Sequence, residues 1–248
     1  MSTALRTSGL GKHFGGMRAV TGVSLSLPQG ARHAIIGPNG AGKTTLINLL
    51  TGMLPPSEGD VYLGEDRVTG LRPDQRVKRG LARTFQINNL FPDLTVLQSL
   101  LLAVCEQRGI AINPWRALDG CTDEIAAARA ILRMLNLEGV ESDVVRQLPY
   151  GQQRLVEIAL ALACRPRVLL LDEPAAGVPK SESEALFQAI AALPRDITVL
   201  FIEHDMDIVF RFAQRITVLV AGAILTEGTP DEIARDPVVK QVYLGDRP

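Results

Sequence analysis

The chain has 248 residues, of which 46% are hydrophobic, and a formal net charge of −1; these values are typical of one large folded domain or two small ones and exclude a disordered chain. The balanced charge gives no basic footprint, so nucleic acid is not an expected partner. No apolar run has the ~18 residues that span a bilayer, and the three cysteines, Cys105, Cys121 and Cys164, fit no metal or disulfide spacing, which indicates reduced thiols in a cytosolic protein.

Strand-like segments separated by glycine and proline dominate the first third of the chain. They are ALRTSGL, VSLSL and ARHAIIG, then, after a helix over residues 42–52, GDVYLG and LARTFQ. From about residue 87 to residue 165 the pattern becomes helical. Thr95 and Gln98 have the spacing of a capping box. One apolar stripe of a later helix contains Ile125, Ala128, Leu132 and Leu135.

After residue 165, short apolar strands alternate with helices. The strands are RVLLLD, DITVLFIE and RITVLVAG, and the helices are KSESEALFQAIAAL and MDIVFRFA. A last helix starts with Thr229 as N-cap, Pro230 at its first position and Glu232 completing a capping box. Apolar strands that alternate with helices predict a parallel sheet covered on both faces. We therefore predict an α/β core over residues 1–86 and 166–248, with an antiparallel β portion and an α-helical insertion over residues 87–165.

The segment GPNGAGKTT follows the strand ARHAII and precedes a helix, and it fits the pattern G-x-x-x-x-G-K-[ST]. Glycines let the backbone N–H groups face phosphate oxygens, and the helix start adds positive charge. Lys43 is expected to reach the β- and γ-phosphates of a nucleotide, and Thr44 to bind Mg²⁺. The alternative is a glycine-rich turn with a solvated lysine. The residues expected at the nucleotide are Gly37, Pro38, Asn39, Gly40, Ala41, Gly42, Lys43, Thr44 and Thr45.

The segment VLLLDEP places two acids at the end of a buried strand. Asp172 is expected to hold Mg²⁺, directly or through water. Glu173 is placed to polarise an attacking water as a general base. The alternative interpretation is an acidic strand end that caps the next helix.

Together with LPYGQQR, these motifs resemble the ATP-binding-cassette (ABC) ATPases, in the family's order and over nearly the whole chain. The resemblance implies a P-loop NTPase core, with GPNGAGKTT as its Walker A motif. It implies that Phe14 stacks on adenine with Val20 beside it. It also implies that Gln86 senses Mg²⁺ and that His204, in IEHDM, contacts the γ-phosphate.

LPYGQQR resembles the family's signature, which faces the γ-phosphate held by another subunit. The resemblance assigns this role to Pro149, Tyr150, Gly151 and Gln152. Free backbone N–H groups of Gly151 and Gln152 would bind the anion. Pro149 stands where most members have serine, and the lost hydroxyl contact is worth ~1 kcal/mol or more; we expect Tyr150 and the backbone to compensate in part. Pro179 stands at or near the place of the family's aspartate that reaches the partner subunit.

The resemblance further implies ATP and Mg²⁺ as cofactors and an ATP-driven closure of two ATPase subunits, which hydrolysis reopens. The second subunit is a copy or, as we favour, a paralogue. Other expected partners are two membrane permease subunits and, indirectly, a substrate-binding protein, which places the chain at the cytoplasmic face of the inner membrane.

Finer resemblance, in KHFGGMRAV, DEPAAGV and DPVVKQVYLG, points to the ATPases of branched-chain amino acid uptake, and the insertion near GIAINPWRAL to the larger of their two paired types. Relatives that import urea, amides or aromatic acids remain alternatives, as does a non-transport ABC ATPase. A nucleotide-binding module without turnover is a third possibility, motivated by Pro149 and Pro179. The residues that argue against it are Lys43, Asp172, Glu173 and His204.

Overall fold

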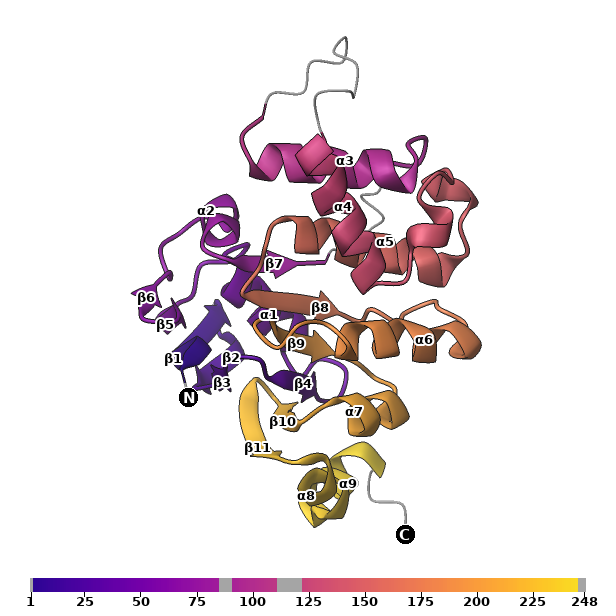
Figure 1. Cartoon of the computed structure of the whole chain (residues 1–248). Helices are drawn as coiled ribbons and strands as arrows, with labels where there is room; N and C mark the ends of the chain where they lie inside the picture. Colours follow the sequence, from indigo (N-terminus) through magenta and orange to yellow (C-terminus); the bar gives the residue numbers. More distant parts are fainter. Residues whose placement is uncertain (1, 85–90, 111–121, 245–248) are drawn as a thin grey trace. The chain divides into compact units, whose positions relative to one another are not determined.

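The structure is a computed structural model that describes residues 2–84, 91–110 and 122–244 (Figure 1). The chain forms two compact units. The core unit consists of Met1–Arg83, Arg167–Pro174 and Pro194–Pro248, and the helical unit of Thr84–Pro166 and Ala175–Leu193.

The main sheet of the core unit has the strand order β11-β10-β4-β9-β8-β7. Its strands are β4 (Arg32–Ile36), β7 (Leu81–Arg83), β8 (Val168–Asp172), β9 (Thr198–Ile202), β10 (Arg215–Val220) and β11 (Ala223–Gly228). All neighbours run parallel except β10 and β11. Every residue of β4, β8 and β9 is buried, as the apolar runs predicted for a sheet covered on both faces. The α/β fold class is thereby confirmed.

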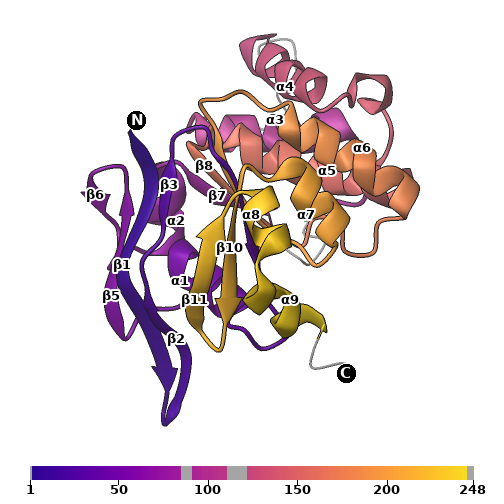
Figure 2. The same ribbon diagram turned by 90° about the horizontal axis from the view of Figure 1, so that it is seen from below.

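A second, antiparallel sheet is built around β1, which pairs with β2, β3 and β5 (Figure 2). Its strands are β1 (Thr3–Phe14), β2 (Met17–Val23), β3 (Ser26–Pro28), β5 (Glu58–Leu63) and β6 (Asp66–Arg67). The sequence did not predict β2 or β11. Both have few buried residues and show no regular apolar alternation, so the pairing partner, rather than local pattern, determines them.

The helices of the core unit are α1 (Lys43–Thr51), α2 (Pro73–Lys78), α7 (Met206–Phe212), α8 (Pro230–Arg235) and α9 (Pro237–Leu244). The capping box of α8, between Thr229 and Glu232, is confirmed. The unpredicted helix α2 brings the buried Arg76 to the end of α1. Its guanidinium donates to the carbonyls of Leu49 and Leu50 at 2.7 and 2.6 Å, which supplies donors to carbonyl groups at the end of the helix.

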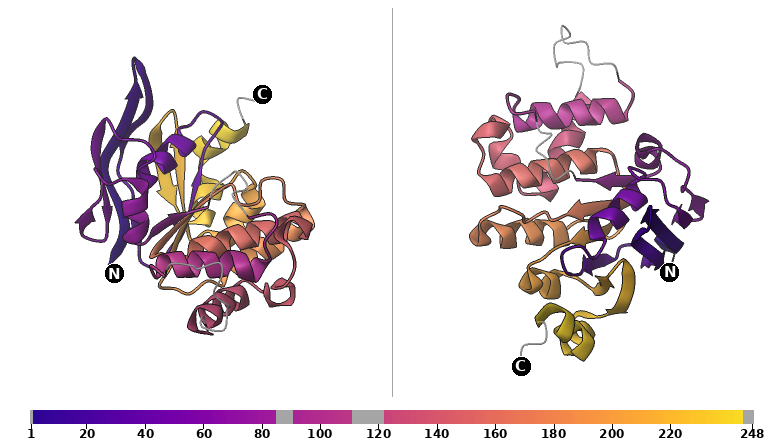
Figure 3. Two further views of the ribbon diagram at one scale, coloured as in Figure 1. Left: turned by 90° about the horizontal axis from the view of Figure 1, so that it is seen from above. Right: turned by 180° about the vertical axis from the view of Figure 1, so that it is seen from behind.

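The helical unit contains α3 (Val96–Gln107), α4 (Thr122–Met134), α5 (Tyr150–Ala163) and α6 (Lys180–Ala191). Helices α3, α4 and α5 pack on one another, and α6 packs on α5 (Figure 3). The capping box of Thr95 and Gln98 is confirmed. We expected the segment of α6 to belong to the core. The structure instead groups residues 175–193 with the helical unit, because α6 packs against α5.

Buried His33 in β4 gives a testable pH dependence of stability. Its Nε2 lies 2.7 Å from Thr217 Oγ1. The pKa of His33 is lowered from 6.5 to about 4, mainly by burial. The charge of Glu227 raises this pKa in part, and the charge of Arg215 lowers it by a smaller amount. The unfolded chain therefore takes up this proton first as the pH falls. The contribution of His33 to the free energy of unfolding is lost between pH 6.5 and 4, by up to about 1.4 kcal/mol per pH unit.

We expect the His33→Gln variant, which has no proton to take up here, to lose less stability than the unsubstituted chain between pH 7 and pH 5. Urea unfolding at both values measures this difference, and the carboxyl groups common to both chains cancel in the comparison. Equal losses in the two chains would contradict the assignment.

Candidate active site

The phosphate loop joins the end of β4 to the start of α1, and two of its glycines have left-handed backbones. Gly40 has φ 79° and Gly42 has φ 96°. A Cβ atom on Gly42 would lie 2.4 Å from the carbonyl oxygen of Ala19 in β2. The loop is also tied to the β10–β11 turn, because the Gly222 N–H donates to the Ala41 carbonyl at 3.0 Å. Glycine is therefore required at position 42 both by φ and by the approach of β2.

Lys43 lies inside this loop. Its ammonium group donates to the carbonyl oxygens of Gly37 and Pro38 at 2.7 and 3.0 Å. Burial lowers the pKa of Lys43, whereas the carboxylates of Glu173 and Asp172 raise it. The cation is thus held within the ring of backbone that is expected to surround phosphate oxygens.

Glu173 and His204 form a pair beside the loop. Glu173 Oε1 lies 2.6 Å from His204 Nε2, and the two residues follow the ends of the neighbouring strands β8 and β9. Glu173 has φ 50°, a left-handed backbone conformation, and its N–H donates to the Ile202 carbonyl at 3.0 Å. Such a backbone costs about 1–3 kcal/mol for a residue other than glycine, and strain of this kind gathers at functional sites.

A pocket of about 520 Å³ brings these groups together in the core unit. Most of the predicted loop residues, from Asn39 to Thr45, line it, with Glu173 and His204. No sequence motif marks five other lining residues, which lie on β2 and on the β10–β11 turn: Met17, Arg18, Ala19, Ala221 and Gly222. Gly222 is the local sequence signal for this turn, because glycine adopts positive φ readily. Both Ala221 and Gly222 have positive φ in the structure.

Four of the residues expected at ATP are not among the lining residues of this pocket: Phe14, Val20, Gly37 and Pro38. Val20 is buried in the core at 1% exposure. Phe14 is 47% exposed, and Lys12 Nζ lies 5.3 Å from the centre of its ring. An exposed ring at the end of β1 is free to stack on a base, so the role of Phe14 stays a prediction.

The expected metal acid, Asp172, ends β8 with its carboxyl group buried. Its Oδ2 accepts a hydrogen bond from Arg83 Nη2 at 2.7 Å, and its Oδ1 has no hydrogen-bond partner among the described residues. Burial raises the pKa of Asp172, and Arg83 lowers it. Mg²⁺ binds carboxylate and hydroxyl oxygens and keeps several of its waters. Asp172 Oδ1, unpartnered among the described residues, and the Thr44 hydroxyl, both in the core unit, are therefore suitable to bind the ion or its waters. Gln86, also expected near the metal, lies outside the described residues.

The start of α5 differs from our expectation. Pro149 is its N-cap and makes no side-chain capping bond. The N–H of Gly151, expected to be free for an anion, donates to Glu182 Oε2 at 3.0 Å. A carboxylate of the first turn of α6 thus supplies the acceptor that Pro149 cannot. The Tyr150 hydroxyl, expected to compensate for the missing serine, accepts from Arg154 Nη2 at 2.7 Å. Pro179 is the N-cap of α6.

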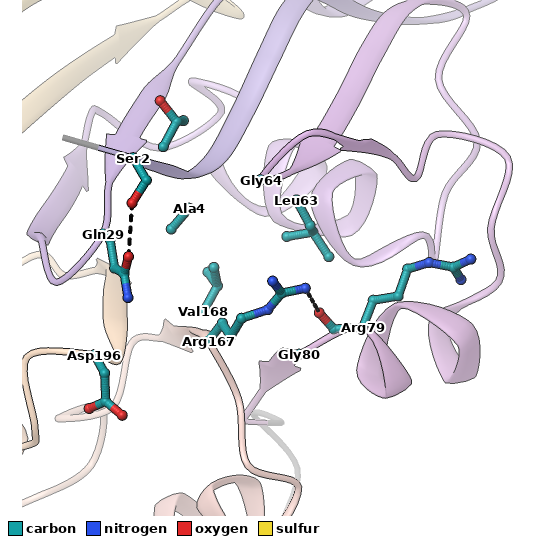
Figure 4. A pocket seen from close by; sticks show the side chains of 11 residues that line it. Ser2, Ala4, Gln29, Leu63, Gly64, Arg79, Gly80, Arg167, Val168 and Asp196 are labelled. Carbon is teal, nitrogen blue, oxygen red and sulfur yellow. Dashed lines mark hydrogen bonds between the residues drawn. The ribbon is translucent and has the colours of Figure 1, made fainter.

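A smaller hollow of about 210 Å³ lies at the amino ends of β7 and β8, away from the strand ends that carry Asp172 and Glu173 (Figure 4). The Ser2 hydroxyl bonds the Gln29 side chain at 2.9 Å, and Arg167 Nη2 donates to the Arg79 carbonyl at 3.0 Å. These polar groups are bonded to protein partners, so the larger pocket is the candidate for chemistry.

A mostly parallel sheet with a phosphate loop, an acid pair at the end of β8 and an inserted helical unit defines a P-loop ATPase of the ATP-binding-cassette class. The chain belongs to the ABC transporter family, whose model matches residues 20–176. A second model, described as branched-chain amino acid ATP-binding cassette transporter, matches residues 223–247.

Relatives of known name cover almost the whole chain. It is 39% identical to the high-affinity branched-chain amino acid transport ATP-binding protein BraF of Pseudomonas aeruginosa, over 98% of each chain. It is 38% identical to LivG of Escherichia coli, a protein with the same description, over 98% of each. The crystal structure of the ADP conformation of the ATP-binding cassette MJ1267 matches with a TM-score of 0.87 and 33% identity, over 99% of this chain and 100% of that one.

The relatives also include a cassette solved as a dimer. The post-hydrolysis state of MJ0796 with ADP and phosphate matches with a TM-score of 0.75 and 28% identity, over 91% of this chain and 98% of that chain. In the part of this chain that the structure describes, every helix is too short or too polar to cross a bilayer.

Proposed function

We propose that this chain is the ATP-hydrolysing subunit of an ABC importer for branched-chain or related amino acids. The descriptions of BraF and LivG support the cargo class, as does the match of the carboxyl-terminal segment. The observation that carries the catalytic part is the Glu173–His204 pair, which lies in the same pocket as the phosphate loop.

In this proposal the backbone amides of residues 39–45 and the ammonium group of Lys43 bind the phosphates of ATP. Thr44 and Asp172, with Gln86, would hold Mg²⁺, which supplies positive charge at the phosphates when it is bound. Glu173 accepts the proton of the attacking water. His204 keeps the Glu173 carboxylate oriented through Nε2, and its ring is proposed to contact the γ-phosphate.

The second half of each site comes from another subunit, a copy of this chain or a paralogue. Its signature residues, Pro149, Tyr150, Gly151 and Gln152, are proposed to face the γ-phosphate from the start of α5. ATP then joins two subunits, and loss of the shared anion after hydrolysis separates them. Two permease subunits and a substrate-binding protein complete the importer, with this chain peripheral at the cytoplasmic face of the inner membrane.

The test is purification of the tagged chain from membranes of its native host, followed by reconstitution of the co-eluting complex in vesicles. We expect two integral permease chains to co-elute, and ATP inside the vesicles to drive uptake of labelled leucine. A Lys43→Ala complex is the control, and its phosphate release should fall about a hundredfold because the phosphates lose their buried cation. A complex that binds ATP without releasing phosphate would favour a nucleotide-binding module instead.

A further inference from the structure

Arg83, the last residue of β7, joins two parts of the active site, the end of β8 and the helix α1. Its Nη2 donates to Asp172 Oδ2 at 2.7 Å, and its Nη1 donates to Asn48 Oδ1 at 2.7 Å. Asn48 belongs to α1, the helix that starts at the phosphate loop. The Arg83 side chain is 12% exposed and that of Asp172 is 1% exposed. One guanidinium therefore holds the end of β8 to the helix of the phosphate loop.

The planar fork of an arginine fixes the direction of each acceptor that it binds. Because Asn48 and Asp172 occupy separate arms of the fork, the guanidinium cannot rotate without breaking a bond. The Asp172 carboxyl group is fixed in turn, since rotation would separate Oδ2 from Nη2. Its other oxygen, Oδ1, stays buried and has no hydrogen-bond partner among the described residues.

The lysine of the loop does not take this position. Lys43 Nζ is bonded to the carbonyls of Gly37 and Pro38. The strand pairing brings Arg83 close to Asp172. Strand β7 runs parallel to β8 with Arg83 opposite Leu170, two residues before Asp172. A side chain as long as arginine is needed to reach the carboxylate from that position.

We propose that Arg83 is a positioning residue for the metal half of the nucleotide site. Anchored by Asn48, it engages one oxygen of Asp172 and thereby presents Oδ1 to Mg²⁺ or to a water of the ion. This inference rests on the proposed function. Partners that orient a ligand in this way change metal affinity about 10- to 100-fold when they are removed.

The experiment compares the purified full-length chain with its Arg83→Met, Arg83→Lys and Asn48→Ala variants. The exposed pair of Arg67 and Asp60 in the same unit provides a matched control, the Arg67→Met variant. Two quantities are measured for each chain: the Kd of ATP in EDTA, and the Mn²⁺ concentration that half-saturates the ATP complex, followed by electron paramagnetic resonance. The spectrum of bound Mn²⁺ reports its coordination without any turnover.

We expect the half-saturating Mn²⁺ concentration to rise about 10- to 100-fold in Arg83→Met, and the Kd of metal-free ATP to stay within about twofold, because this residue is not placed at the phosphates. Asn48→Ala should show a smaller rise and Arg83→Lys a partial one, since lysine keeps the charge but not the fork. Arg67→Met should match the unsubstituted chain.

Unchanged or tighter Mn²⁺ binding in Arg83→Met would overturn the positioning role, and tighter binding would mean that Arg83 competes with the metal. If Arg83→Met does not fold, Asn48→Ala decides, and normal Mn²⁺ binding there would reject the inference. Failure of the proposed function looks different. If the nucleotide site is misassigned, the unsubstituted chain binds no ATP in EDTA or in Mn²⁺; if turnover is absent, its membrane complex binds ATP but releases no phosphate.

Discussion

Replacing Glu173 with glutamine is expected to lower ATP turnover by about 10²- to 10⁴-fold, the contribution typical of a general base. Glutamine keeps the shape of the side chain and a polar contact with His204, but it cannot accept the proton of the attacking water. ATP binding should survive, because the loop residues are unchanged. The variant should therefore accumulate as an ATP-bound pair of subunits. Phosphate release by the membrane complex measures the rate, and light scattering of the chain with ATP and Mg²⁺ measures the pairing.

The matched control for this substitution is Glu65→Gln, which makes the same chemical change at an exposed position of the core unit. It should leave both quantities unchanged. Normal phosphate release by the Glu173→Gln complex would show that another group removes the proton.

Substitution of Gly151 with aspartate is expected to abolish ATP-dependent pairing and to lower phosphate release by about a hundredfold or more, as the loss of an anion-binding donor does elsewhere. A Cβ atom at this position would lie 2.5 Å from Glu182 Oε2, and the new carboxylate would repel both Glu182 and an incoming phosphate. The nucleotide pocket is in the core unit, so ATP binding by the single chain should stay unchanged. Sedimentation with and without ATP measures the pairing.

Gly139→Asp serves as the control in the same unit, because a Cβ atom at Gly139 meets no atom within 4 Å. This variant should pair and hydrolyse ATP normally. Full activity of Gly151→Asp at dilutions where no pairing occurs would contradict the proposal that a second subunit completes each site.

The parts of the site that the sequence predicted are those that follow the ends of parallel strands. Asp172 and Glu173 follow an apolar run, His204 follows another, and the phosphate loop follows a third. Strands of this kind end at one edge of the sheet, so local pattern and chain order are enough to bring these residues together. The fold class was predictable for the same reason.

The parts that the sequence did not predict depend on contacts between distant segments. Arg83 and Asp172 are 89 residues apart, and Gly151 and Glu182 are 31 apart. Neither pair has a spacing that marks a motif. Likewise, β2 forms a wall of the pocket only because it pairs with β1, and its own residues show no strand pattern. Such contacts follow from the three-dimensional arrangement of elements rather than from any short stretch of sequence.

The Glu182 carboxylate already accepts the hydrogen bond of the Gly151 amide. Binding of another anion at this amide would therefore be an exchange reaction. One acceptor leaves and another takes its place, so the number of hydrogen bonds at that amide does not increase. The net free energy then depends on the difference between a carboxylate returned to water and a more highly charged phosphate taken from it. A chain with this arrangement keeps its helix start satisfied while it is alone, and in the proposed function an incoming phosphate would have to displace Glu182 from that amide.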